Sequence, residues 1–355
     1  MTGSQIEKLR AGLAESGQGD VRLMETHISW VLLGTALAWK IKKPVKLDFL
    51  DFTELQARHY YCRRELQLNQ RLSPDIYLAV TPVFKEGDRF SFVAGEGEIV
   101  DYAVVMRKLD NTLLLSEKLK SGAVTEKFME NLASKLAAFH QGEAPVYNEW
   151  DETVALKTFR EIGSGREWLA GKMEGYDPAW ADGWIRQAES VNELFRWRFE
   201  QRISQGFMRD VHGDLHAGNI FCYENNPVIF DCLEFDDSFR EIDLLYEIAF
   251  LCTDLDFYGY EHLKKAFLSA YQYRLPVILM KEDVLIFKYF CLVRAAIRFH
   301  VTSLKGISQE LTPAEWESVA AYAKLAQKYS AQLLYLTEHY IHFEKEVFRF
   351  EDTFD

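Results

Sequence analysis

The stretch Val211-His212-Gly213-Asp214-Leu215-His216-Ala217-Gly218-Asn219-Ile220 is the most informative part of this chain of 355 residues. Twelve residues after Asn219, the apolar run Val228-Ile229-Phe230 ends at Asp231. Sites of phosphoryl transfer use such a set: one carboxylate accepts the proton of an attacking hydroxyl, while an amide and a second carboxylate bind Mg²⁺ beside the nucleotide phosphates. We therefore predict that Asp214 is the catalytic base and that Asn219 and Asp231 are the metal ligands.

Two histidines flank the predicted base. Because His212, Asp214 and His216 alternate along the chain, they are also compatible with a single metal site. A dinuclear hydrolase would need more histidines than the nine present, and none of these clusters near Asp231. We predict that His212 supports catalysis by hydrogen-bonding the backbone around the loop, and that Gly213 allows a tight turn before the base. His216 remains open between a supporting role and contact with phosphate or substrate.

The composition indicates a globular protein with more than one compact unit. A length of 355 residues favours two lobes or two domains, and 48% hydrophobic residues suffice for a sizeable core. The net charge of −13 argues against nucleic acid or an anionic membrane as a partner. We expect no signal peptide and no membrane-spanning segment. The five cysteines include no CxxC pair, so we expect a reducing cytoplasm and no disulfide framework. The oligomeric state stays open.

The first hundred residues predict a small sheet with one helix. The runs His27–Leu33 and Ala36–Lys42 favour strands, and the Gly34-Thr35 break between them suits a tight hairpin. From about Phe52 to Leu72 the apolar spacing becomes helical, and Ser73-Pro74 would end that helix. Three further strands are predicted at 76–83, 89–93 and 98–106.

After Leu109 the pattern is almost wholly helical, apart from the region 207–235 that holds the predicted base and metal ligands. A small sheet followed by a large helical part is the arrangement of protein kinases. We predict an α+β fold with two lobes: a small β-sheet lobe over residues 1–109, which binds nucleotide, and a large, mainly helical lobe over residues 110–355.

Two segments of the helical lobe are expected to select the substrate. One is an insertion at 146–206 with five tryptophans, and the other is a helical tail from about Tyr260 to Phe348. In that tail Arg294 and Arg298 are four residues apart and share a helix face. Facing a cleft, they would favour an anionic substrate such as a sugar acid or sugar phosphate, although solvent exposure is the more common fate of such charges.

A lysine and a glutamate complete the predicted nucleotide site. Lys40 ends the run Ala38-Trp39-Lys40, and Lys42 follows on the same face of the strand. We choose Lys40 to neutralise phosphate oxygens, with Lys42 as the second choice. Glu65 lies in the next predicted helix and would pair with that lysine and hold it in place. Taken singly, such residues are usually solvated, but their order ahead of the predicted base favours function.

Beyond these patterns, the chain resembles the aminoglycoside phosphotransferase family, whose relatives include choline kinases. The resemblance rests on HGDLHxxNI at 212–220 and the Ile-Phe-Asp strand at 229–231, and it extends over roughly residues 25–255. The closer match is an uncharacterised branch of that family. It shares Glu25-Thr26-His27-Ile28-Ser29-Trp30, Lys40-Ile41-Lys42-Lys43-Pro44-Val45, the run 229–236 and Arg240-Glu241-Ile242-Asp243. Many members of that branch carry a second nucleotide-kinase domain, whereas this chain has no GxxxxGK[ST] motif and resembles a stand-alone form.

The resemblance implies a bilobal protein-kinase-like fold, ATP or GTP with Mg²⁺, and phosphorylation of a small-molecule hydroxyl. It matches the residues already singled out: Asp214 as base, Asn219 and Asp231 as metal ligands, and Lys40 as phosphate lysine. It also implies that Asp243 braces the catalytic loop from a helix. Backbone groups of the interlobe hinge at Met106, Arg107 and Leu109 would bind the adenine. No GxGxxG covers the phosphates, a lack that this chain shares with antibiotic and choline kinases.

Two other functions are compatible with the same sequence. One is a catalytically silent sensor or scaffold that binds nucleotide, although a dead kinase usually lacks at least one of the catalytic residues that are intact here. The other is a protein kinase. The absence of a Gly-rich loop and of an Ala-Pro-Glu motif after Asp231 argues against it.

Overall fold

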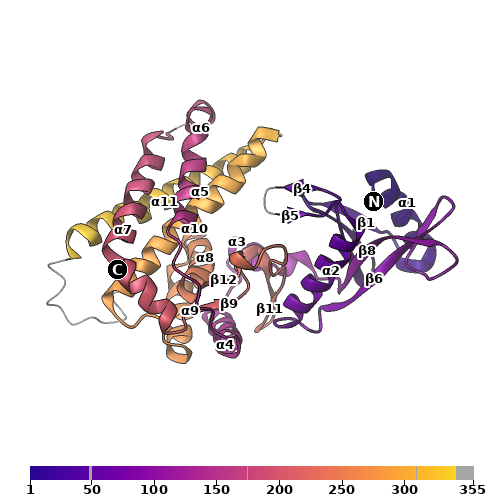
Figure 1. Cartoon of the computed structure of the whole chain (residues 1–355), viewed down its shortest axis with the longest axis horizontal. Coiled ribbons are helices and arrows are strands. Elements are labelled where there is room, and N and C mark those ends of the chain that lie inside the picture. Colours follow the sequence, from indigo (N-terminus) through magenta and orange to yellow (C-terminus); the bar gives the residue numbers. More distant parts are fainter. Residues whose placement is uncertain (48–49, 174, 309, 341–355) are drawn as a thin grey trace. The chain divides into compact units, whose positions relative to one another are not determined.

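The computed structural model of the chain describes residues 1–47, 50–173, 175–308 and 310–340 (Figure 1). The chain folds into two compact units. The first comprises Met1–Lys118, His212–Asp214 and Gly218–Arg240, and the second comprises Leu119–Val211, Leu215–Ala217 and the chain from Glu241 onward. The sheet is in the first unit and most helices are in the second, which confirms the predicted α+β class. The lobe boundary at residue 109 stays a prediction.

The first unit is built on an antiparallel sheet of six strands, in the order β1-β2-β3-β8-β6-β7. These strands are Arg22–Glu25 (β1), Ser29–Leu33 (β2), Leu37–Lys42 (β3), Tyr77–Glu86 (β6), Arg89–Ser91 (β7) and Glu98–Arg107 (β8). The predicted hairpin is confirmed, because β2 pairs with β3 across a tight turn in which the Gly34 amide donates to the Leu37 carbonyl at 2.9 Å. β1 was not predicted, nor was the short pair Lys46–Leu47 (β4) and Leu50–Asp51 (β5).

Helix α1 (Gly3–Leu13) covers one face of this sheet and was not predicted. It buries three apolar side chains in a cluster that includes Trp39 and Ile41 of β3. A capping box starts the helix: the Thr2 hydroxyl accepts from the Gln5 amide, and the Gln5 side chain accepts from the Thr2 amide. The capping residues can be recognised in the sequence. The first twenty residues are mostly polar, however, so the apolar face of the helix gives only a weak periodic signal.

Helix α2 (Leu55–Gln70) forms where the helical spacing predicted it and packs on β3, β6 and β8. Successive side chains of a strand point to opposite faces of the sheet. Because Trp39 and Ile41 pack with α1, Lys40 and Lys42 point to the face that α2 covers. The two lysines considered for the phosphates are therefore directed at the helix that carries Glu65.

A short hairpin in the first unit carries the predicted metal ligands. It consists of Ile220–Tyr223 (β10) and Asn226–Ile229 (β11), with Ile220 paired to Ile229. Asn219 immediately precedes the first strand and Asp231 follows the second by two residues. The pairing therefore fixes the two residues at the same end of the hairpin.

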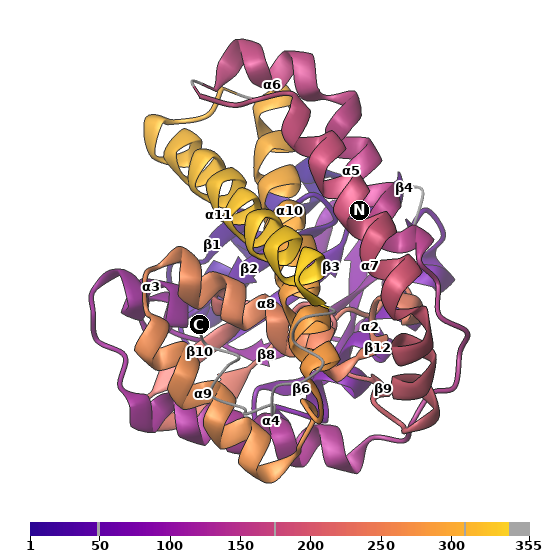
Figure 2. The same cartoon turned by 90° about the vertical axis from the view of Figure 1, so that its left-hand side faces the viewer.

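The second unit is mainly helical, as predicted, and Figure 2 shows its two longest C-terminal helices, α10 and α11, packed side by side. Its helices are Glu126–Gly142 (α4), Thr153–Ser164 (α5), Arg166–Lys172 (α6), Ala179–Ser204 (α7), Leu244–Phe257 (α8), Glu261–Arg274 (α9), Lys281–Ser308 (α10) and Pro313–Glu338 (α11). Helix α3 (Leu115–Lys120) begins in the first unit and ends in the second, and Met208–Asp210 (β9) pairs with Glu241–Asp243 (β12). The insertion at 146–206 is helical, and the part of the predicted tail beyond residue 340 lies outside the described residues.

In the part of the chain that the structure describes, no helix combines the length and the apolar character that crossing a bilayer requires.

All five cysteines are buried and free, which predicts low reactivity. Burial raises the pKa of the Cys62, Cys222 and Cys291 thiols to about 12, and only the thiolate is a strong nucleophile. We expect the native protein to release no thionitrobenzoate from Ellman's reagent within minutes at pH 8. After unfolding in guanidinium it should release five equivalents per chain. Fast reaction of a cysteine in the native protein would contradict this packing.

Candidate active site

The predicted base follows a turn that only glycine tolerates well. Gly213 has a φ of +85°, and a Cβ atom at this position would lie 2.6 Å from the carbonyl oxygen of Phe239. Any side chain here would be both strained and in collision with the backbone. The prediction that Gly213 permits a tight turn before Asp214 is confirmed.

His212 makes the backbone contacts predicted for it. The ring is fully buried, its Nε2 lies 2.8 Å from the Phe230 carbonyl oxygen, and the Asp214 amide donates to its Nδ1 at 3.2 Å. Since Nδ1 accepts a hydrogen bond, the proton of the neutral ring is on Nε2, which donates to Phe230. His212 thus links the backbone of Asp214 to the residue before Asp231. A contribution of His212 to catalysis stays a prediction.

Asn219 lies against the predicted base. Its side-chain nitrogen donates to Oδ2 and to the backbone carbonyl of Asp214, each at 3.0 Å. The backbone carbonyl of Asn219 accepts a hydrogen bond from the Phe230 amide at 3.1 Å. Asn219 therefore lies across the hairpin from the residue before Asp231. The contact of Asn219 with Asp214 is thus made by its amide nitrogen, and a role for its amide oxygen as a metal ligand stays a prediction.

Asp231 has a strained backbone. Among the residues that the structure describes, Asp231 (φ 64°) and Glu224 (φ 53°) have a positive φ without being glycine. Such strain persists only where the surroundings hold it, and it concentrates at functional sites. Here the Asp231 amide donates to the Tyr77 hydroxyl at 3.0 Å, and the carboxylate, 43% exposed, pairs with Lys40 at 2.7 Å. The fold thus directs a half-exposed carboxylate to one fixed position.

Lys40 joins two carboxylates. Its Nζ lies 2.9 Å from Oε1 of Glu65 and 2.7 Å from Oδ1 of Asp231. Burial alone would lower the pKa of this ammonium, but the charges of Asp231 and Glu65 outweigh burial and raise it well above its usual value. Lys40 is therefore cationic, and the predicted pairing of Glu65 with Lys40 is confirmed.

Lys42 is enclosed, whereas Lys40 is not. The Lys42 side chain is 0% exposed and contacts Oε2 of Glu65 at 2.7 Å and the carboxylate of Glu234, while Lys40 is 13% exposed. A lysine with no access to solvent cannot reach a nucleotide phosphate without rearrangement. The geometry favours Lys40 over Lys42 for that role. Glu234 was not predicted from the sequence, because nothing in its spacing marks it as the partner of a residue 192 positions away.

Two of the three predicted hinge residues belong to a strand of the sheet. Met106 pairs with both neighbouring strands, the Arg107 amide donates to Ile76 at 2.9 Å, and the Lys108 amide donates to Ala36 at 2.9 Å. Met106 and Arg107 thus belong to the end of β8. Leu109 follows the strand and is partly buried.

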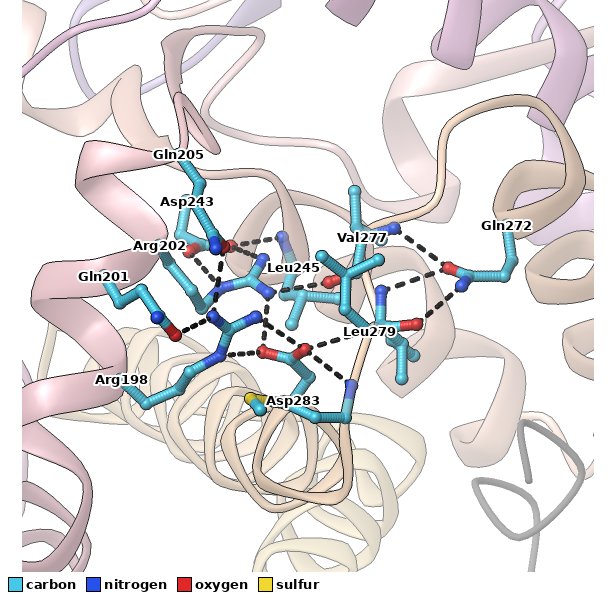
Figure 3. A network of polar contacts seen from close by, with 12 residues as sticks. Arg198, Gln201, Arg202, Gln205, Asp243, Leu245, Gln272, Val277, Leu279 and Asp283 are labelled. Atoms are coloured by element: carbon cyan, nitrogen blue, oxygen red, sulfur yellow. Dashed lines mark hydrogen bonds and ion pairs between the residues drawn. The ribbon is translucent and has the colours of Figure 1, made fainter. Parts of the chain in front are cut away.

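Asp243 belongs to a buried network in the second unit, shown in Figure 3. Its carboxylate accepts two hydrogen bonds from Arg202, at 2.7 and 2.8 Å, and one from the Leu245 amide at the start of α8. Asp283 accepts from Arg202 at 2.8 Å and twice from Arg198 at 2.8 Å (Figure 3). The network ties α7 to the starts of α8 and α10. Asp243 therefore positions helices, and the brace that we expected it to supply to the catalytic loop stays a prediction.

Asp283→Ala is expected to lower the free energy of unfolding by about 3–5 kcal/mol, because it leaves two buried guanidinium groups short of a counter-charge. Urea unfolding followed by circular dichroism measures the change. The control is Glu152→Ala, which breaks the exposed pair with Arg196 on the same helix α7 and should cost at most about 1 kcal/mol. Equal urea midpoints for the two variants would refute the assignment of Asp283 as a buried anchor.

In the second unit, a different carboxylate binds the segment after the predicted base. Oδ2 of Asp254 accepts from the Ala217 amide at 2.9 Å, and its Oδ1 accepts from the Tyr322 hydroxyl at 2.9 Å. The ring of His216 packs on Phe250, with centroids 5.3 Å apart. Asp254 had not been singled out in the sequence, because it lies in an apolar helix with no marker of function.

The two arginines of α10 lie beside these groups. The Arg294 guanidinium is 3.7 Å from the ring centre of Tyr246 and 4.5 Å from that of Phe250, and the residue is buried. Arg298 donates to the Tyr322 hydroxyl at 3.2 Å and lies 3.7 Å from Asp254. Neither arginine has the fully exposed position that is common for such residues. Both lie among the side chains that surround residues 215–217.

The oxygen ligands present suit magnesium better than zinc. Among the described residues, no three His, Cys, Asp or Glu side chains gather as a metal cage. The amide of Asn219 and the carboxylate of Asp231 supply oxygen, and Mg²⁺ is commonly bound by one or two such protein ligands plus phosphate and water. The residues present thus fit a nucleotide-bound Mg²⁺.

Comparison with known proteins gives both a family and a fold. The model of the phosphotransferase enzyme family matches residues 55–278. An uncharacterized protein of Mycobacterium tuberculosis, Rv2004c, is 34% identical over 263 residues, which cover 72% of this chain and 49% of that protein. The chain thus spans about half the length of the curated relatives that it matches.

Two solved structures are similar in fold. A choline/ethanolamine kinase family protein from Mesorhizobium loti has a TM-score of 0.53 at 11% identity, covering 94% of this chain and 99% of that one. Choline kinase from Cryptosporidium parvum Iowa II has a TM-score of 0.50 at 12% identity, covering 96% of each chain. At these identities the likeness concerns the fold, which is the kinase-like fold predicted from the sequence. Since the family model covers more than half of its residues, the chain belongs to the phosphotransferase enzyme family.

Proposed function

We propose that this protein is a small-molecule kinase that uses ATP or GTP with Mg²⁺ to phosphorylate a hydroxyl group of a small metabolite or antibiotic. The observation that carries the proposal is the position of Lys40, which contacts both Glu65 and Asp231 within the unit that also holds Asp214 and Asn219. A cation held between a buried and a half-exposed carboxylate is poised to exchange the exposed one for phosphate.

The mechanism assigns a task to each of the five residues. Asp214, fixed by the side chain of Asn219, orients the acceptor hydroxyl and takes its proton. Lys40 neutralises charge on the phosphate oxygens, and Glu65 holds Lys40 in place. When bound between Asn219 and Asp231, the metal would neutralise charge on the nucleotide phosphates. Catalysis then rests on positioning and electrostatics, without a phosphorylated enzyme intermediate.

The base of the nucleotide is assigned to the end of β8. The Arg107 and Lys108 amides already donate within the first unit, so we assign the backbone of Leu109 to the adenine or guanine ring. This narrows the earlier expectation for Met106, Arg107 and Leu109 to one residue. The nucleotide would then extend from Leu109 toward Lys40 along the sheet.

Nucleotide consumption measured over a panel of hydroxyl compounds tests the proposal. The panel contains sugars, sugar acids, sugar phosphates, amino alcohols, nucleosides and aminoglycosides, each with ATP and GTP, and Asp214→Ala serves as the inactive control. We expect turnover that depends on one compound class and is lost in the control. Calorimetric binding of Mg-nucleotide without turnover on any compound would favour the silent sensor, and absence of binding would overturn the proposal.

A further inference from the structure

Five charged residues of alternating sign form one continuous chain in the first unit. From the exposed end inward they are Asp231, Lys40, Glu65, Lys42 and Glu234. Glu65 is the centre of the chain, because Oε1 contacts Lys40 at 2.9 Å and Oε2 contacts Lys42 at 2.7 Å. The proposed mechanism uses the first three residues and leaves Lys42 and Glu234 without a task.

That inner pair is costly to bury. The side chain of Lys42 is 0% exposed and that of Glu234 is 4% exposed. Removing two charges from water is expensive, and apolar residues of the same size often serve a fold equally well or better. A buried pair next to a catalytic lysine therefore calls for an explanation other than stability.

The charge states support ions at the centre of this chain, whereas at its inner end burial outweighs the two lysines and raises the pKa of Glu234. Burial alone would raise the pKa of Glu65, but Lys40 and Lys42 outweigh burial and hold it at about 2. Burial would likewise lower the pKa of Lys42, but Glu234 and Glu65 outweigh burial and raise it. Both lysines and Glu65 are thus charged at neutral pH.

Resting on the proposed function, we propose that Lys42 and Glu234 are positioning residues for the phosphate lysine. Lys42 occupies Oε2 of Glu65 and so fixes the carboxylate with Oε1 directed at Lys40. With Asp231 engaged by a metal, Lys40 would keep Glu65 as its carboxylate partner. The remaining contact to Glu65 holds Lys40 in place only because Lys42 fixes Glu65 through its other oxygen, Oε2.

Glu234 also helps to fix the position of the backbone that follows Asp231. The segment is held at each residue: the Asp231 amide by Tyr77, the Cys232 amide by Asn69 at 2.9 Å, and the Leu233 carbonyl by Arg240 at 2.7 Å. Glu234 adds a side-chain contact to β3 through Lys42. One buried pair therefore couples the strand of the phosphate lysine to the strained segment of the metal ligand.

A thermodynamic cycle tests the proposal. The double variant Lys42→Met/Glu234→Met removes both charges and leaves none of the pair buried alone. We expect it to bind Mg-ATP about 10–100-fold more weakly by calorimetry, the range found when residues that orient a ligand-binding group are lost. Lys40→Met should weaken binding strongly in the wild type but only slightly in the double variant, since there Lys40 is already misplaced.

Two controls separate positioning from stability. Arg58→Met breaks another buried ion pair of the same unit, with Asp101, and should lower the melting temperature without changing the affinity for Mg-ATP. Glu234→Gln keeps a hydrogen-bond acceptor for Lys42 and should lie between the wild type and the double variant. Additive effects of Lys40→Met in the two backgrounds would overturn the positioning role while leaving the proposed kinase activity intact. A wild-type protein that binds no Mg-nucleotide would instead overturn the proposed function itself.

Discussion

Asp231→Asn is expected to reduce turnover by roughly 10³-fold or more while the protein stays folded. The substitution removes the carboxylate that the proposed metal needs, and losing a charge-stabilising group in phosphoryl transfer costs 10³–10⁵-fold in comparable systems. Asparagine tolerates a positive φ, so the backbone angle of 64° at this position is retained. Turnover at saturating nucleotide, titrated with Mg²⁺, measures the loss, and thermal unfolding by circular dichroism checks the fold.

Glu224→Asn is the matched control for this variant. Glu224 is also acidic and also has a positive φ, of 53°, but it is exposed at the turn between β10 and β11. We expect it to keep the wild-type rate and Mg²⁺ dependence. If Asp231→Asn kept a tenth of the wild-type turnover, Asp231 would not be the metal ligand.

Short-range patterns in the sequence predicted the elements that position the site. Apolar, β-favouring runs predicted five of the six strands of the sheet, all but β1. Helical spacing predicted α2, and the HGDLHxxNI stretch predicted the turn at Gly213 and the contacts of His212. Each of these depends on residues close together in the chain. The pairing of Lys40 with Glu65 also followed, because kinases pair a lysine on a strand with a glutamate on the next helix, and both lie here in that order ahead of the predicted base.

The contacts that the sequence did not predict join distant segments. Glu234 reaches Lys42 across 192 positions, and Asp283 reaches Arg198 across 85. A buried charge gives no periodic signal, so only the folded chain shows which opposite charge it meets. The same holds for Asp254, whose partner Ala217 is 37 positions away.

Asp214→Asn is expected to lower kcat by about 10²–10⁴-fold, the contribution typical of a general base. The amide that replaces the carboxylate still offers an oxygen to the side chain of Asn219, which now contacts Oδ2 at 3.0 Å, so the local geometry is kept. The proton acceptor alone is lost. Steady-state rates with the acceptor compound identified by the panel assay measure the effect.

The dependence on magnesium separates the base from the metal ligand. Asp214→Asn should leave the Kd for Mg-nucleotide and the Mg²⁺ concentration at half-maximal rate unchanged, whereas Asp231→Asn should shift both. Asp88→Asn, at an exposed carboxylate paired with Lys8 in the same unit, should change neither kcat nor binding. If Asp214→Asn weakened nucleotide binding and left kcat unchanged, Asp214 would be a nucleotide-binding residue and would not be the base. Because the two aspartates differ in what they contact, with Asp214 partly buried beside Asn219 and Asp231 half-exposed beside Lys40, we expect the two variants to differ in this way.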